Sequence, residues 1–422
     1  MKRALATALI ALTALNFTAC GGSDEKEGTK ITVQVEEAWL PYYEQVKETV
    51  LKNNEGSEIE FKVVGSFDHL DTIDKTGNTN ADVADLFALP ADRLYGLAGN
   101  EVLASLDAEA MAEEIGGFAD FKGGLGGNLQ VDGEYLAFPY NIETLVGYVN
   151  VENAKTAGLD LTNGVEFTDL AFEQGITTVH DAWFGVGFAN SAGFEFLAKD
   201  GENLVSDGTK AWADLNADQK ALFESLYTYW SEYKGTDLWD KEAAFAYGSD
   251  KFKTGSTGVL NIDGPWSAAG LTEQLGEEGL AVLPLNKITF NGKPLQHWKG
   301  GWGLGINSRV EEDEAKMTLA TDFIKEMVNP ANAIELFKHT GKILENVTPD
   351  AYNDIDAMNK KVIDATYEGY EASVNRPLFT EYGSVWATWQ NALLSWSTSN
   401  PANAEEAYNQ VKASFDAMMA NY

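Results

Sequence analysis

The stretch DVADLFALP at residues 82–90 has the character of a strand, because its apolar residues follow two aspartates and end at a proline. Two earlier runs also have the character of strands, because ITVQV at 31–35 alternates apolar and polar residues and EIEFKVV at 58–64 is similar. Apolar side chains recur at helical spacing through residues 41–54, and a further helix is expected after Pro90. Strands that alternate with helices predict a parallel α/β sheet. Ligands of such sheets bind in loops at the carboxyl ends of the strands, which here begin at Glu36, Gly65 and Ala88.

The rest of the chain changes character twice. Residues from about 150 to 280 are mostly helical in pattern, and strand-like runs return at LAVLPL (280–285) and WGLGINS (302–308) before a helical region that continues to Tyr422. A chain of 422 residues is also too long for one ordinary core. The order of these regions predicts two discontinuous domains joined by several crossings.

The charge of the chain limits its partners. The formal net charge is -35 and the sequence pI is about 4.3. Such a surface repels phosphate backbones and anionic lipid headgroups, so we expect no nucleic-acid binding and no charge-driven membrane binding. A neutral or cationic ligand fits this surface better.

The first nineteen residues have the pattern of a secretory signal peptide. Lys2 and Arg3 precede an apolar run that is too short to span a membrane, and small residues follow it. FTAC at 17–20 resembles the bacterial lipobox, in which a cysteine receives the lipids, although Phe17 stands where leucine is usual. We therefore expect residues 1–19 to be removed, Cys20 to be lipidated, and residues 20–29 to form a flexible tether. The mature chain would lie outside the cytoplasm, held at the membrane by its lipid alone; the alternative is that Cys20 is an incidental thiol in a discarded leader.

No sequence motif of a common enzyme is visible. The four histidines form no metal-ligand spacing, and no Gly-x-Ser-x-Gly motif occurs, so neither a metal nor a cofactor is expected. The glycines between 116 and 127 do not match a phosphate-binding loop. Paired carboxylates for glycoside hydrolysis remain open, because 65 acidic residues supply such a pair by chance.

Four tryptophans lie at the ends of expected elements, where either a core role or a ligand role is open, and a fifth, between glycines, is left undecided. An indole face is apolar and flat and matches the C–H face of a sugar ring, while sugar hydroxyls need charged or amide partners. Trp389 and Trp396 recur at helical spacing and are expected in the core, as are the aromatic residues of the stretch 229–233. The four at element ends are Trp39, Trp183, Trp266 and Trp386, and the undecided one is Trp302.

The order of several segments resembles the extracellular solute-binding proteins of sugar ABC transporters, most closely the maltose and maltodextrin-binding branch. The segments are ADVADLFALPADRLYGLAGNEVLASLD (81–107), VDGEYLAFPYNIETLVGYVN (131–150), KFKTGSTGVLNIDGPWSAAGL (251–271), LAVLPL, GGWGLGINS (300–308) and ATDFIKEMVNPANAIEL (320–336). The resemblance implies an α/β fold of two lobes, as in periplasmic binding proteins, with a ligand cleft between them.

On this pattern the lobes are discontinuous in sequence. The first lobe would take residues 30–142 and 285–328, and the second 147–280 and 333–422. Hinge segments would lie near 143–146, 281–284 and 329–332. The lobes would close on the ligand by a hinge motion, and the closed, monomeric form would dock on the permease subunits of the transporter.

The resemblance also implies a set of ligand-binding residues. Asp92 and Arg93 match a pair that holds sugar hydroxyls, and Glu143 matches a carboxylate close to the hinge. Asp181 and Trp183 match an acidic residue and a stacking aromatic, and Trp266 and Trp386 match two stacking tryptophans of the second lobe. Asp71 is a weaker candidate.

Two departures concern the identity of the ligand. The maltose-binding pattern has a tryptophan in the strand before the Asp-Arg pair, and this chain has none before Asp92 and Arg93. The pattern also has an Asp-Lys pair in the first loop, where this chain has EEAWLP at 36–41, so Trp39 is expected to supply a platform there. The leading hypothesis is a lipid-anchored receptor, without catalysis, that captures maltodextrin-type α-glucan oligosaccharides for an ABC importer. The alternatives are a surface-anchored glycan-degrading enzyme and a receptor of the same fold for another solute.

Overall fold

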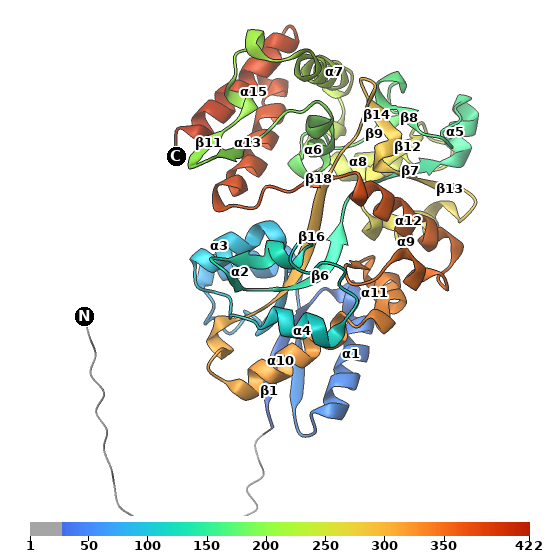
Figure 1. Ribbon diagram of the computed structural model, residues 1–422. Helices are drawn as coiled ribbons and strands as arrows, with labels where there is room; N and C mark the ends of the chain where they lie inside the picture. The colour runs from blue at the N-terminus through green and yellow to red at the C-terminus, as the bar shows by residue number, and fades with distance from the viewer. Residues whose placement is uncertain (1–27) are drawn as a thin grey trace, which may run out of the picture.

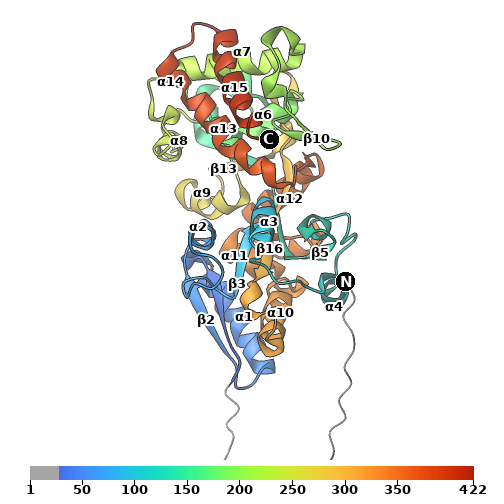
Figure 2. The ribbon, with the colours of Figure 1, turned by 90° about the vertical axis from the view of Figure 1, so that its left-hand side faces the viewer.

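The computed structural model describes residues 28–422, which form two lobes joined by long crossing strands (Figures 1 and 2). The predicted signal peptide and Cys20 lie outside the described residues. Within residues 28–422, no helix is both long and apolar enough to cross a bilayer. Two lobes of mixed helix and strand are the fold class that the sequence predicts.

The sheet of the first lobe contains the strand predicted within residues 82–90. The strands follow the spatial order β17-β6-β16-β3-β1-β2, and β18 (Val374–Asn375) pairs with β16 at one end. β1 runs parallel to β2 and β3, as expected, but β16 is antiparallel to β3 and β6. The predicted parallel arrangement is therefore confirmed for β1, β2 and β3, whereas β16, which returns from the other lobe, runs in the opposite direction. The strands are β1 (Lys30–Val35), β2 (Glu58–Val63), β3 (Leu86–Pro90), β6 (Phe138–Glu143), β16 (Trp298–Ile306) and β17 (Ile343–Leu344).

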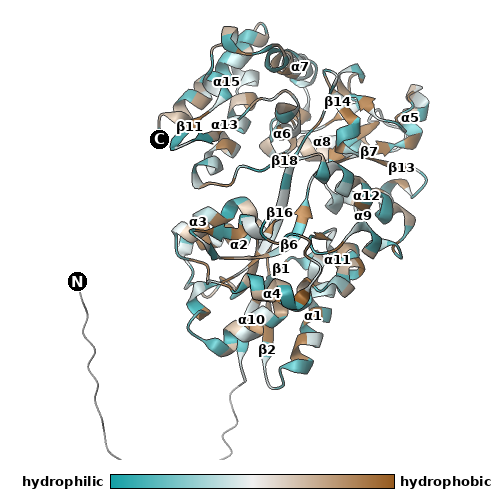
Figure 3. Ribbon diagram, viewed as in Figure 1, coloured by the Kyte–Doolittle hydropathy of each residue, from teal (hydrophilic) through white to brown (hydrophobic). Residues whose placement is uncertain are grey.

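Helices cover the first sheet and bury its apolar faces. α1 begins at Leu40 with Pro41 in its first turn, where a missing N–H costs nothing, and it buries Tyr43, Val46 and Val50. It packs against α10, and Figure 3 shows hydrophilic residues alternating with hydrophobic ones along outer helices such as α4. The buried side chains of α1 follow the helical spacing that the sequence predicts for residues 41–54. The helices of this lobe are α1 (Leu40–Asn53), α2 (Ser66–Thr76), α3 (Leu94–Gly99), α4 (Ala108–Ile115), α10 (Glu314–Met327) and α11 (Ala333–Thr340).

The second lobe has a smaller sheet and a larger helical part. The sheet order is β13-β7-β12-β9, with β7 antiparallel to both neighbours. Trp230, Trp389 and Trp396 have no exposed surface, so the expectation that they are core residues is confirmed. The elements are β7 (Val146–Asn150), β9 (Gly175–Ile176), β12 (Leu260–Asp263), β13 (Leu280–Pro284), α5 (Val151–Ala157), α6 (Ala182–Ser191), α7 (Ala217–Tyr233), α8 (Ala244–Lys251), α9 (Ala268–Leu275), α12 (Ala357–Glu371), α13 (Gly383–Leu394), α14 (Trp396–Ser399) and α15 (Ala404–Met419).

The expected limits of the lobes differ from the strand pairing in two places. Residues 285–328 are expected in the first lobe, but β14 (Ile288–Phe290) pairs with β8 (Val165–Glu166) and packs in the core of the second. Residues 333–422 are expected in the second lobe, but β17 pairs with β6 of the first sheet. A strand of two residues leaves no alternating pattern in a sequence, so its pairing cannot be predicted from periodicity.

Two of the three expected hinge segments do not lie where the chain crosses between the lobes. β13 occupies residues 280–284 within the second sheet, and residues 330–332 form a short turn of helix between α10 and α11. The chain instead crosses within β16 and again between Tyr352 and α12, whose apolar side continues the core of the first lobe. The crossing between Glu143, at the end of β6, and Val146, at the start of β7, coincides with the expected hinge.

Candidate functional site

A cleft of about 820 Å³ lies between the two lobes. Its volume is within the range of ~300–1,000 Å³ that small-molecule sites occupy. The first lobe contributes the loops that follow β1 and β3, at the carboxyl ends of parallel strands, which is where the alternation of strands and helices predicts a ligand. The cleft brings together all eight residues expected to bind a ligand: Trp39, Asp92, Arg93, Glu143, Asp181, Trp183, Trp266 and Trp386. The weaker candidate, Asp71, is exposed on α2 and does not line the cleft.

Trp266 lies on the surface of the cleft and not in a core. It follows Pro265 in a short 3-10 helix, and 42% of its surface is exposed. Its indole lies against Gly264, where an added Cβ would come within 2.1–2.3 Å of three carbons of the ring. Gly264 is therefore needed to let the indole fold back along the wall, with its other side open to the cleft.

Asp181 and Trp183 share the first turn of α6. The Asp181 carboxylate accepts a hydrogen bond from the Trp183 backbone N–H at 2.9 Å, and so caps the helix. Burial raises the pKa of the Asp181 carboxyl above its usual value. The Trp183 ring approaches Gly300 of β16, where an added Cβ would lie 3.0 Å from the indole. The helix cap thus fixes the carboxylate and the indole side by side at the cleft.

Arg376 lies in a cage of three indoles that sequence reasoning did not find. Its guanidinium carbon is 5.3 Å from the ring centre of Trp183 and 5.4 Å from those of Trp298 and Trp386. A guanidinium at this distance from an indole face is attracted to the ring. Its Nη2 atom is 2.9 Å from Asp92 Oδ1, in an ion pair whose arginine side chain is only 3% exposed.

The partners of Asp92 and Arg93 differ from the expected joint role. Asp92 pairs with Arg376, and Arg93 pairs with Asp74 on α2. The two neighbours in sequence therefore point their charges at different partners. Arg93 still lines the cleft, but its guanidinium is partly engaged. The pairing with Arg376 could not be predicted, because 284 residues separate it from Asp92 and only the fold brings them together.

Glu143, Trp302 and Lys342 form a second buried charged group in the cleft. Trp302 Nε1 donates a hydrogen bond to Glu143 Oε2 at 3.0 Å. The Lys342 ammonium is 4.4 Å from the ring centre of Trp302, 4.7 Å from that of Trp39 and 5.2 Å from that of Tyr140. Trp302, whose place the sequence leaves open, is thus a largely buried wall of the cleft.

The charges of this group influence one another. Burial raises the pKa of Glu143, while Lys342 and the Trp302 N–H act against that shift. Burial lowers the pKa of Lys342, and the carboxylates of Glu143 and Glu36 oppose it. Lys342 follows Gly341 in a stretch without a motif, so the sequence carries no signal that would have indicated its role.

The polar groups of the cleft are largely engaged by the protein itself. Four partly buried carboxyl groups line the cleft, and each is held by a protein partner: Asp92 by Arg376, Glu143 by Trp302, Asp181 by the start of α6, and Glu36 by Ser66. Among residues 28–422 there is no cluster of side chains that could hold a metal ion. Several indoles with a few carboxylates around them form a surface that suits the apolar face and the hydroxyl rim of a sugar.

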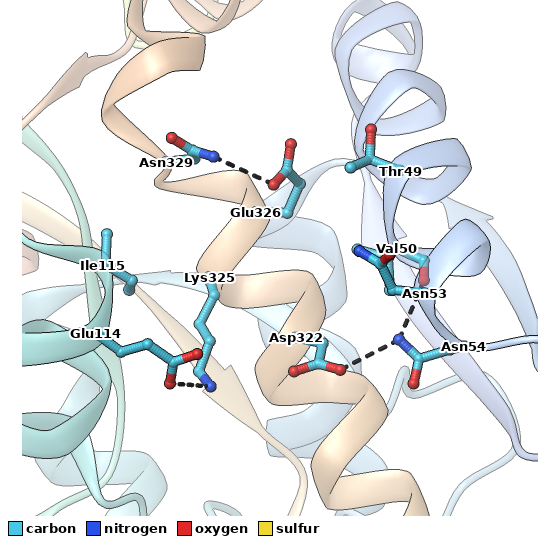
Figure 4. Close-up of a pocket in the computed structure, with 10 residues that line it drawn as sticks. All are labelled: Thr49, Val50, Asn53, Asn54, Glu114, Ile115, Asp322, Lys325, Glu326 and Asn329. Atoms are coloured by element: carbon cyan, nitrogen blue, oxygen red, sulfur yellow. Dashed lines mark hydrogen bonds and ion pairs between the residues drawn. The ribbon is translucent and has the colours of Figure 1, made fainter.

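Another hollow, on the first lobe, lacks these features (Figure 4). It lies between α1, α4 and α10, and no aromatic side chain lines it. Three pairs of its polar side chains bind one another: Lys325 with Glu114, Asn54 with Asp322, and Asn329 with Glu326. The cleft is therefore the candidate ligand site.

Comparisons with known proteins agree with this architecture. The chain is 26% identical to the maltodextrin-binding protein MdxE of Bacillus subtilis (strain 168), over 98% of this chain and 97% of that protein. The crystal structure of the maltose-binding periplasmic protein MalE from Listeria monocytogenes, in complex with maltose, matches with a TM-score of 0.68 and 20% identity, over 94% of this chain and 100% of that one. MalX from Streptococcus pneumoniae, in complex with maltopentaose, matches with a TM-score of 0.69 and 21% identity, over 92% and 99%.

The structural matches establish the fold, since their identities are low. The model of the bacterial extracellular solute-binding protein family matches residues 44–366, which is most of the chain and includes parts of both lobes. With the two-lobed fold and the cleft between the lobes, this match identifies the chain as a member of the family of bacterial extracellular solute-binding proteins.

Proposed function

We propose that the protein captures maltodextrin-type α-glucan oligosaccharides in the cleft and delivers them to the permease of an ABC importer. The observation that carries the proposal is the set of indoles from the second lobe that faces carboxylates of the first lobe across one cavity. The maltodextrin-binding and maltose-binding names of the similar proteins support the choice of sugar. The family is extracellular, which agrees with a receptor that works outside the cytoplasm.

In this proposal Trp183, Trp266 and Trp386 stack on the C–H faces of successive glucosyl rings, and Trp39 adds a platform from the first lobe. The carboxylates of Asp92, Glu143 and Asp181 accept hydrogen bonds from sugar hydroxyls, and Arg93 donates to them. The residues are supplied by both lobes, so a bound oligosaccharide contacts both. A ligand with more contacts in the closed form shifts the chain toward that form, and the closed form docks on the permease.

We propose that the chain is held at the outer face of the cell membrane by lipid on Cys20. The lipobox-like sequence FTAC and the polar stretch that follows it support this anchor. Expression in a bacterial host, followed by fractionation, tests it. The wild-type chain should remain with the membrane, whereas Cys20→Ala should be released; release of both would contradict the anchor.

Titration with neutral oligosaccharides tests the binding function. Calorimetry and tryptophan fluorescence should both respond to maltotriose, because several indoles line the cleft. A control incubation with maltodextrins should leave the sugar unchanged, whereas release of new reducing ends would favour the alternative of a glycan-degrading enzyme. The absence of a response to any sugar would contradict the proposal and would leave a receptor for another solute as the alternative to test.

A further inference from the structure

Lys342 is a buried cation of the cleft whose ammonium group has no ionic partner. The residue is only 7% exposed, and its side chain lines the cleft. Within residues 28–422 its Nζ atom makes no ion pair and no hydrogen bond, and only its backbone N–H is bonded, to Thr340 Oγ1 at 3.1 Å. The other two cations that line the cleft, Arg93 and Arg376, are both ion-paired.

The surroundings of the ammonium attract a cation but leave its N–H groups without acceptors. Its Nζ atom lies 4.4–5.2 Å from the ring centres of Trp302, Trp39 and Tyr140. Aromatic faces attract a cation, but they do not replace the oxygen acceptors that an ammonium has in water. Burying a charged group is unfavourable unless it is paired and hydrogen-bonded, so the Lys342 ammonium needs acceptors from outside the described residues.

The ladder between β17 and β6 sets Lys342 beside Glu143. Ile343 pairs with Ile142 and Leu344 with Asn141, so the next position of this antiparallel ladder brings Lys342 opposite Glu143. The side chains of opposite residues lie on the same face of a sheet. Trp302 of β16 contacts both, since its Nε1 donates to Glu143 and its ring lies 4.4 Å from the Lys342 ammonium. The cleft therefore carries a hydrogen-bond acceptor and a donor side by side.

The residue before Lys342 lies against the second lobe. Gly341 has a φ of 68°, and a Cβ added there would come within 2.8 Å of the Trp266 Cα and 3.3 Å of the Pro265 carbonyl oxygen. Lys342 thus stands next to a point where the first lobe touches the second. A sugar enclosed between the lobes here takes the place of solvent around the ammonium, so its hydroxyl oxygens become acceptors within reach.

We propose that Lys342 is a further ligand-binding residue, whose ammonium donates hydrogen bonds to hydroxyl oxygens of the sugar ring held beside Glu143. The inference rests on the proposed function and deepens it, because Lys342 is not among the eight residues expected to bind the ligand. One hydroxyl donates to the Glu143 carboxylate and its neighbour on the same ring accepts from Lys342, so the two side chains together fit a pair of adjacent hydroxyls.

A matched pair of lysine variants tests the role of the ammonium. Lys342→Met removes the N–H donors and keeps an apolar side chain of similar length. Lys299→Met is the control, since the Lys299 ammonium also lies over an aromatic ring, 5.9 Å from the centre of Tyr370, but Lys299 does not line the cleft. In calorimetric titration Lys342→Met should bind maltotriose about tenfold more weakly or worse, as for a lost hydrogen bond to a charged group. Lys299→Met should bind it as the wild type does.

A second measurement observes the ammonium in the wild-type chain. With isotope-labelled lysine, the side-chain ammonium resonance of Lys342 is the one that Lys342→Met and Lys342→Arg both lack in NMR spectra. This resonance should shift when maltotriose is added, whereas that of Lys299 should not. An unshifted Lys342 resonance would overturn the inference even if Lys342→Met bound weakly, because the weak binding would then come from altered packing.

The failures of the two proposals are distinguishable. If the wild-type chain binds no maltotriose, the proposed function itself fails. If the wild-type chain binds maltotriose and Lys342→Met binds it equally well, only the inference about Lys342 is overturned.

Discussion

Replacing Trp266 by alanine separates a ligand platform from a core residue. An indole offers ~250 Å² of surface, so its 42% exposure leaves about 100 Å² that a ligand can cover. At about 25 cal/mol per Å², complete covering would contribute ~2.5 kcal/mol, and a sugar covers mainly one face. We therefore expect Trp266→Ala to weaken binding of maltotriose by about 1 to 2 kcal/mol, which is ~5- to 30-fold. Calorimetric titration measures this change directly.

The same variant should fold almost as stably as the wild type. The matched control is Trp389→Ala, since Trp389 is fully buried and its Nε1 donates to the Val179 carbonyl at 2.9 Å. Loss of a buried tryptophan costs about 3 to 5 kcal/mol of unfolding free energy. Thermal unfolding of both variants supplies the comparison. If Trp266→Ala lost stability as Trp389→Ala does, while its sugar affinity stayed at the wild-type value, Trp266 would be a core residue and the reasoning would be refuted.

Three further predictions concern Arg376, Glu345 and Gly341. Arg376→Met leaves the Asp92 carboxylate without its cation, so denaturant unfolding should show a loss of about 3 kcal/mol in unfolding free energy. Adding Asp92→Asn should restore part of this loss, whereas additive losses of the two substitutions would contradict the pairing. Burial raises the pKa of Glu345 to about 7, above the ordinary value of ~4.3 for a glutamate. The contribution of the protonated Glu345 carboxyl to the free energy of unfolding is therefore complete below pH ~4.3 and is lost as the pH rises through about 7. Glu345→Gln should remove this slope from unfolding measured across that range, and an unchanged slope would refute the assignment. Gly341 and Gly276 both have a positive φ, so alanine at either position should destabilise the fold. Only an added Cβ at Gly341 meets Trp266, at 2.8 Å, so Gly341→Ala alone should weaken sugar binding as well. Equal sugar affinities of the two variants would exclude a role for this contact between the lobes.

Much of the first lobe can be predicted from its sequence, because its signals are local. Residues 31–35 and 58–64 alternate as strands, and the apolar spacing of residues 41–54 is that of the helix found there. The limits of the lobes could not be predicted in the same way. β17 has two residues, and its place beside β6 depends on a contact between segments about 200 residues apart. No local pattern records such a pairing.

The candidate site shows the same division. The expected tryptophans and carboxylates could be found because they stand at the ends of elements within motifs of recognisable order. Arg376 and Lys342 could not be found, although each lies among several aromatic rings. A single cation in a polar stretch looks like any exposed lysine or arginine, and only the fold places it under indoles. Arg93 illustrates the converse, because its sequence neighbour Asp92 suggests a joint role that the fold divides.

A crystal structure of the protein with maltotetraose would show whether an α-glucan binds between the lobes. We expect glucosyl rings stacked on Trp183, Trp266 and Trp386, with hydroxyls within hydrogen-bond distance of Asp92 and Glu143. A sugar bound only on the outer surface, or a cleft that stays without sugar at saturating maltotetraose, would contradict this expectation.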